Sequence, residues 1–193
     1  MSQIELFLPA VCQGISGPLA MMMREALLRA AIRFCRESLI SRETLTFGSL
    51  PAGEIVVLTP AEPERIMSRL LSATACINAQ KAALWPGDGF ALLAESRLRL
   101  DRAVDRLWVR IATEPSATAV TLPSVLLAYQ DALAAGALMQ LYMMPDKPWS
   151  DVRRADYYRI RFIEGYREAF RSSSEAAPDE TGFHNPPRRH AFF

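Results

Sequence analysis

The amino-acid sequence predicts an α+β protein that is mainly α-helical: a bundle of about three long helices with a small β-rich insert and an extended C-terminal tail. Two amphipathic helical patterns lie near residues 18–40 and 150–171, and an almost uncharged helical pattern lies near residues 123–144. Between the helical patterns at 18–40 and 123–144, residues 43–121 are rich in β-prone runs and turns. We therefore expect one connected domain over residues 1–171, followed by a linker and a tail.

Composition limits the function classes. The chain has 193 residues, 50% of them hydrophobic and 22% charged, which is ordinary for one globular domain. A formal net charge of +1 predicts no nucleic-acid binding from bulk electrostatics. Of the 22 basic residues only Lys81 and Lys147 are lysines. The arginine excess fits either bidentate pairing at interfaces or simple codon bias.

The first helical pattern follows a lead-in over residues 1–17 that contains Pro9 and two glycines. We expect a helix from Pro18, which a first turn tolerates, to about Ile40, with Ser16 or Gly17 as the cap. Its apolar face contains Leu19, Met23, Leu27, Ala30, Ala31 and Phe34. Its arginines fall elsewhere around the helix: Arg24, Arg29, Arg33 and Arg36.

The insert is expected to contain short strands joined by turns. The β-prone runs are residues 44–47, 54–59, 97–101 and 106–113. In the last run apolar residues alternate with polar or aromatic ones, the apolar set being Leu107, Val109 and Ile111. Residues 86–89, Pro-Gly-Asp-Gly, predict a firm turn. Residues 64–84 are ambiguous between strand and helix.

The pattern at 123–144 predicts a helix buried on most sides, because Asp131 is its only charged residue. Its length approaches a membrane span, but Gln130, Asp131 and Gln140 interrupt it, and such groups are costly in lipid. Gly136 lies among alanines and allows a neighbouring helix to approach closely.

The third helix is expected to begin at Ser150, a good N-cap, with Asp151 favourable at the positive end of the helix dipole. One face is apolar and contains Val152, Ala155, Tyr158, Phe162, Tyr166 and Ala169. After Arg171 the pattern ends, and residues 172–182 have the composition of a linker.

The last segment, residues 183–193, combines aromatic, proline and basic residues in a way that suits a docking peptide. Its candidate contact residues are Phe183, His184, Pro186, Pro187, Arg188, Arg189, His190, Phe192 and Phe193. The alternative is an ordinary disordered terminus.

No residue set in the sequence indicates catalysis, a cofactor or a metal. Cys12, Cys35 and Cys76 are isolated, so neither a disulfide framework nor a zinc site is expected. Both histidines lie in the tail, without a rigid partner for general-base chemistry. The start of the chain lacks the basic region of a signal peptide, which predicts synthesis in the cytoplasm.

Two regions of the sequence, which together cover a little over half of the chain, share a pattern with a known family. The first comprises Phe7-Leu8-Pro9 and residues 26–38. The second comprises Leu122-Pro123, Tyr129, Asp131-Ala132, Gly136-Ala137-Leu138, Pro148-Trp149-Ser150-Asp151, Ala155, Tyr158, Phe162 and Gly165. In these residues the chain resembles head-to-tail connector (adaptor) proteins of tailed bacteriophages.

The resemblance implies a structural, non-enzymatic protein of the virion neck, made in the host cytoplasm. Such connectors form homo-oligomeric rings, usually twelvefold, that bind below the portal protein. They extend the DNA channel, without sequence-specific binding, and offer a surface to tail or neck proteins. The tail at 183–193 would then reach the portal. The alternative is a small helical nucleic-acid-binding regulator that uses the arginine-rich first helix, which predicts steeply salt-dependent DNA affinity.

Overall fold

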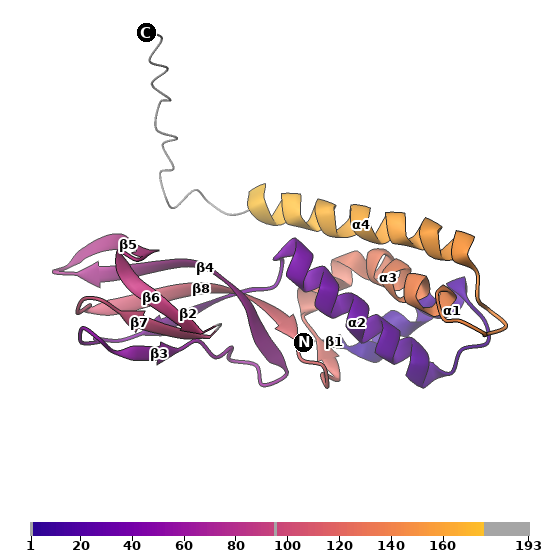
Figure 1. Ribbon diagram of the computed structural model, residues 1–193, viewed down its shortest axis with the longest axis horizontal. Coiled ribbons are helices and arrows are strands. Elements are labelled where there is room, and N and C mark those ends of the chain that lie inside the picture. The colour runs from indigo at the N-terminus through magenta and orange to yellow at the C-terminus, as the bar shows by residue number, and fades with distance from the viewer. Residues whose placement is uncertain (1, 95, 176–193) are drawn as a thin grey trace, which may run out of the picture.

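The computed structural model describes residues 2–94 and 96–175. A helical part and a β-sheet part lie end to end, so the molecule is elongated (Figure 1). The helical part contains η1 (Ile4–Phe7), α1 (Leu8–Gly14), α2 (Ala20–Ser38), η2 (Ser124–Tyr129), α3 (Gln130–Tyr142) and α4 (Val152–Glu175). It also contains a two-stranded sheet formed by β1 (Ser2–Gln3) and β9 (Thr121–Leu122).

Helix α2 follows the apolar spacing of its sequence. Leu27, Ala30 and Phe34 are fully buried against the other helices. The helix ends because Leu39 adopts the left-handed conformation, with φ of 50°, and its N–H donates to the Cys35 carbonyl at 2.9 Å. The chain then turns directly into the sheet.

Helix α3 is buried on nearly all sides, as its lack of charge predicts. Its small residues let α2 and α4 approach together. A Cβ placed on Gly136 would lie 2.7 Å from two ring carbons of Phe162 and 2.9 Å from the Cβ of Ala30. The predicted close helix contact at Gly136 is therefore confirmed. Gly165 makes the matching approach from α4 to Ala132 of α3.

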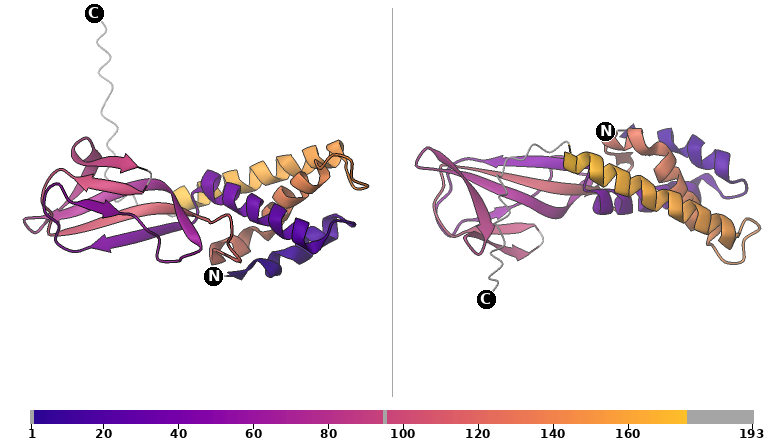
Figure 2. Two further views of the ribbon diagram at one scale, coloured as in Figure 1. Left: turned by 60° about the horizontal axis from the view of Figure 1, so that its bottom comes forward. Right: turned by 90° about the horizontal axis from the view of Figure 1, so that it is seen from above.

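The β-sheet part is one seven-stranded sheet in the order β2-β8-β4-β5-β6-β7-β3, curled into a half-barrel. Its strands are β2 (Arg42–Phe47), β3 (Ile55–Val57), β4 (Arg65–Ile77), β5 (Gln80–Pro86), β6 (Gly89–Ala94), β7 (Arg97–Leu100) and β8 (Arg106–Pro115). All neighbours are antiparallel except β5 and β6, which are parallel. Figure 2 shows the long strands extending away from the helices.

The inner face of the sheet forms a second apolar core. The alternation predicted for residues 106–113 is confirmed, since Leu107, Val109 and Ile111 are fully buried there. The predicted Pro-Gly-Asp-Gly turn is also present between β5 and β6, where Gly87 and Gly89 have φ of 82° and 123°.

Polar contacts join the two parts where α2 and α4 meet the sheet. Arg36 of α2 holds the buried Glu114 of β8 through two hydrogen bonds, Nε to Oε2 at 2.9 Å and Nη2 to Oε1 at 2.6 Å. Arg42 at the start of β2 donates to the carbonyl and hydroxyl of Ser173 at 2.9 and 2.8 Å. These bonds fix the end of α4 to the edge of the sheet.

The expected bundle of about three long helices with a small β insert is wrong. The described residues contain four α-helices and a seven-stranded sheet, with 42% helix against 32% strand. The sheet is large because the ambiguous residues 64–84 form β4 and β5. Register shifts between Met67 and Arg69 and between Leu70 and Ser72 break the two-residue alternation of β4, which hid the strand in the sequence.

The fourth helix, α1, lies within residues 1–17, which the sequence predicts only as a lead-in to the first long helix. Pro9 stands in the first turn of α1, where its missing N–H costs nothing, and the helix ends at Gly14. At the other end of the chain, α4 continues to Glu175, four residues into the segment read as a linker. No helix among the described residues is long and apolar enough to cross a membrane.

Candidate functional site

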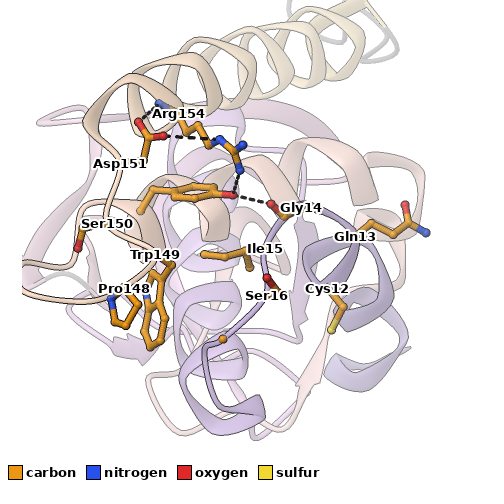
Figure 3. A pocket seen from close by; sticks show the side chains of 12 residues that line it. Cys12, Gln13, Gly14, Ile15, Ser16, Pro148, Trp149, Ser150, Asp151 and Arg154 are labelled. Atoms are coloured by element: carbon orange, nitrogen blue, oxygen red, sulfur yellow. Dashed lines mark hydrogen bonds and ion pairs between the residues drawn. The ribbon is translucent and has the colours of Figure 1, made fainter.

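A surface pocket lies at the elbow between α3 and α4, where it meets the loop between α1 and α2 (Figure 3). We call it the elbow pocket; its volume is about 790 Å³. It is lined by Cys12, Gln13, Gly14, Ile15, Ser16, Gly17, Tyr142, Pro148, Trp149, Ser150, Asp151 and Arg154. Gly17 has φ of 114°, and a Cβ there would lie 2.8 Å from the Trp149 ring. The loop therefore needs glycine at this position, both for its backbone and for the indole.

Tyr142 is the central polar group of the elbow pocket. Its hydroxyl donates to the Gly14 carbonyl at 2.6 Å and accepts from Arg154 Nη1 at 3.0 Å. The ring stacks on Tyr158 with centroids 5.8 Å apart. Burial raises the pKa of Tyr158, and the hydrogen bond to Tyr142 raises the pKa of Arg154, so both keep their protons at neutral pH. These contacts fasten α1, α3 and α4 to one another.

The elbow also corrects one expectation about capping. Helix α4 begins at Val152, and Asp151 is its cap, because Asp151 Oδ1 accepts from the backbone N–H of Arg154 at 3.0 Å. Ser150 was predicted for this role. Its hydroxyl instead donates to the Met144 carbonyl and accepts from the Lys147 N–H, which closes the turn before the helix.

The polar groups around the elbow pocket are engaged in holding the turn together. Asp151 forms an ion pair with Arg154, and Arg154 also donates to the Tyr142 hydroxyl. The exposed Cys12 thiol lies 3.8 Å from Met23 Sδ. Across residues 2–94 and 96–175 no group of three or more histidine, cysteine or carboxylate side chains could hold a metal ion. The elbow pocket can therefore present an aromatic surface, formed by Tyr142 and Trp149, that internal hydrogen bonds hold in place.

The predicted docking residues of the tail all lie outside the described residues. These are Phe183, His184, Pro186, Pro187, Arg188, Arg189, His190, Phe192 and Phe193. Their role as contact residues stays a prediction.

The arginines of α2, on which a nucleic-acid-binding alternative depends, are engaged within the fold. Arg24 pairs with Glu5 at 2.9 Å, Arg29 pairs with Glu25, and Arg36 pairs with Glu114. The guanidinium of Arg33 lies over the Phe162 ring at 5.8 Å. Helix α2 therefore presents little uncompensated charge to a polyanion.

Two apolar surfaces lie on different sides of the helical part. The outer side of α4, which we call the α4 surface, exposes Val152, Tyr157, Ile160 and Phe170. The second, which we call the α2-start surface, exposes Leu6, Leu19 and Met21. Figure 1 shows α4 along one long edge of the helical part and the first turn of α2 near the opposite edge. Sequence periodicity placed Leu19 and Val152 on the apolar faces of their helices, but the structure leaves them 71% and 66% exposed.

The residues that carry the resemblance to phage connectors come together in space. Phe7, the buried apolar residues of 26–35, Leu122, residues 137–138 and Phe162 contribute to one core between the helices. The two glycines of the pattern allow close contacts, Gly136 with Phe162 of α4 and Ala30 of α2, and Gly165 with Ala132 of α3. Segments more than a hundred residues apart in the sequence thus form one structural unit.

Comparison with solved structures shows a likeness to a phage-like particle component. The chain is similar to a chain in a solved structure described as "Neck of empty GTA particle computed with C6 symmetry". The two are 17% identical, the match covers 80% of this chain and 87% of that chain, and the TM-score is 0.30. No family model and no curated protein matches the chain. A likeness at this level leaves the function to be argued from the residues themselves.

Proposed function

We propose that this chain is a structural virion protein: a ring-forming head-to-tail connector that binds below the portal, extends the DNA channel and provides the tail attachment surface. The observation that carries the proposal is the convergence of the connector-like residues on one helical core. The apolar residues of the resemblance and its two closely packed glycines, Gly136 and Gly165, belong to this single helical unit.

The ring requires two different surfaces on each subunit, because a head-to-tail interface joins unlike faces and closes by rotation. The α4 surface and the α2-start surface supply such a pair. Met21 is 78% exposed and Ile160 is 52% exposed, so each offers apolar surface to a neighbouring subunit. In a closed ring the α4 surface of one subunit contacts the α2-start surface of the next. The expected copy number is twelve.

Native mass spectrometry and electron microscopy of the purified protein, alone and with its portal, test the ring. Ile160→Arg and Met21→Glu should each prevent ring formation, because each places a charge in the apolar contact. Ile55→Glu is the matched control, since Ile55 is 41% exposed but lies on β3 in the sheet part. Rings that form equally well from all three variants would refute this interface. A protein that stays monomeric with the portal present would refute the ring.

The tail is proposed to leave its own domain and dock on the portal. Phe183, Phe192 and Phe193 would supply apolar anchors, and Arg188 and Arg189 would supply directional donors. Removal of residues 183–193 should leave the domain folded while it weakens attachment to DNA-filled heads. Wild-type occupancy of the neck by the truncated protein would refute this role.

A further inference from the structure

The outward face of strands β2, β8, β4 and β5 carries a concentration of positive charge that the overall composition conceals. Directly paired residues of neighbouring antiparallel strands point to the same side of a sheet. The four rows on this side of the sheet are Arg42–Ala112–Arg69, Thr44–Arg110–Ser72, Thr46–Trp108–Thr74–Ala83 and Arg106–Cys76–Lys81. In the first row Ala112 itself is fully buried. The opposite face of the same strands is the buried apolar core. We call the outward rows the basic sheet face.

The four rows contain five cations and no acidic residue; the next residue on this side of β8, Glu114, is paired with Arg36. The cations are Arg42, Arg69, Lys81, Arg106 and Arg110. Among the described residues none of these five makes an ion pair, in contrast to the arginines of α2. Asp105, next in sequence to Arg106, turns its carboxylate toward the backbone N–H of Ala79 at 3.5 Å. The charge on this face is therefore left uncompensated by the fold.

Two observations indicate that the cations are held together rather than dispersed. Lys81 Nζ and the Arg106 guanidinium each lie 5.8 Å from the centre of the Trp108 ring, which anchors both near one point. At the other end, burial and then the neighbouring charge of Arg110 lower the pKa of Arg42. Like charges gathered in this way repel one another, so a polyanion bound across them would relieve an unfavourable field.

We propose that the basic sheet face binds the phosphate backbone of a nucleic-acid duplex without reading its sequence. Arginine, lysine, serine and threonine are the side chains that contact phosphates, and the basic sheet face is built from these types around a single tryptophan. The rows run from Arg106 to Ala112 of β8, which is six steps of 3.3–3.4 Å or about 20 Å and matches roughly six base pairs.

The same geometry argues against the other polyanions. A single strand would need free aromatic faces for its bases to stack on, whereas the Trp108 ring already has Lys81 and Arg106 above it. An acidic protein partner would need apolar anchors, and the rows offer hydroxyls and small residues in their place. The inference stands on the sheet alone and holds whether or not the ring proposal does.

The test is the affinity of the full chain for a labelled duplex of about 30 base pairs, measured by fluorescence anisotropy over a range of salt concentrations. We expect a dissociation constant of about 10⁻⁴–10⁻⁶ M, equal for two unrelated sequences. Arg42 already donates hydrogen bonds to Ser173, so four cations remain to neutralise phosphates. At about −0.9 per phosphate, the slope of log K against log salt should be about −3.6. The variant Arg106→Gln/Arg110→Gln should reduce this slope by about 1.8, and Arg106→Lys/Arg110→Lys should preserve it.

Two control variants carry the same charge change elsewhere. Arg97→Gln/Arg99→Gln alters β7, and Arg29→Gln/Arg33→Gln alters α2; both should leave the slope unchanged. If the double variant Arg106→Gln/Arg110→Gln proves unstable, the single variant Lys81→Gln, at an exposed position, replaces it and should reduce the salt slope by about 0.9.

Several results would overturn the proposal: no binding at low salt, an equal loss in a control variant, tighter binding of polyglutamate than of the duplex, or loss of binding on removal of residues 183–193. Native mass spectrometry of the same samples reports ring formation separately. Duplex binding and the ring can therefore fail independently.

Discussion

Replacement of Gly136 tests whether the three long helices meet as the structure describes. A Cβ at this position would come within 2.7 Å of Phe162 Cδ2 and Cε2 and within 2.9 Å of the Ala30 Cβ. The Phe162 ring is 1% exposed and is confined by Phe34 and Tyr166, with ring centroids 6.1 and 5.6 Å away. It cannot move aside without disturbing the core.

The magnitude follows from two opposing effects. Gly136→Ala gains about 1 kcal/mol of helix propensity and loses about 1–3 kcal/mol to overpacking, for a net destabilisation of about 0–2 kcal/mol. Gly136→Leu adds three more carbons in the same space and should lose about 3 kcal/mol. For a chain of this size that loss lowers the melting temperature by roughly 6–12 °C.

Thermal and urea unfolding followed by circular dichroism provide the measurement. The control is Gly48→Ala, because no atom lies within 4 Å of a Cβ there, and its stability should change by less than about 0.5 kcal/mol. Phe162→Leu in the Gly136→Ala background should recover part of the loss, as expected for two residues in contact. A Gly136→Leu midpoint equal to that of Gly48→Ala would refute the close crossing.

Three further predictions concern single contacts. Arg36→Met should destabilise the fold by about 3 kcal/mol in urea unfolding, because the Glu114 carboxylate, which is only 4% exposed, loses its bidentate partner. The double variant Arg36→Met/Glu114→Leu should recover most of that loss, because no buried charge is then left unpaired. Hydrogen bonds from Thr121 hold the pKa of Glu64 below its ordinary value of 4.5. The stabilisation that they give the folded state is therefore present above pH 4.5 and is lost as the pH falls through the lower pKa of the folded protein. Glu64→Gln should make the free energy of unfolding less pH-dependent below pH 4.5, and an unchanged pH profile would count against the contact. Burial raises the pKa of Cys35 to about 12, so in the native protein a thiol reagent should modify the exposed Cys12 well before Cys35, and equal rates would contradict that burial.

Local periodicity was sufficient for several features. The alternation of Leu107, Val109 and Ile111 identified β8, and the near absence of charge identified α3 as a buried helix. The alanines around Gly136 indicated a close crossing, which the structure places against Phe162 and Ala30. Each of these signals lies within one element, where side-chain direction follows from the repeat of the backbone.

The size of the sheet and the nature of its surface depended on tertiary structure. Bulges disguised β4, and β2 pairs with β8 across more than sixty residues, a register that no local pattern specifies. The basic sheet face arises only from that pairing, because Arg42, Arg69, Lys81 and Arg106 come from four different strands. The same holds for charge. The sequence shows arginines throughout, but only the fold decides that Arg36 pairs with the buried Glu114, whereas Arg110 forms no ion pair with any residue that the structure describes.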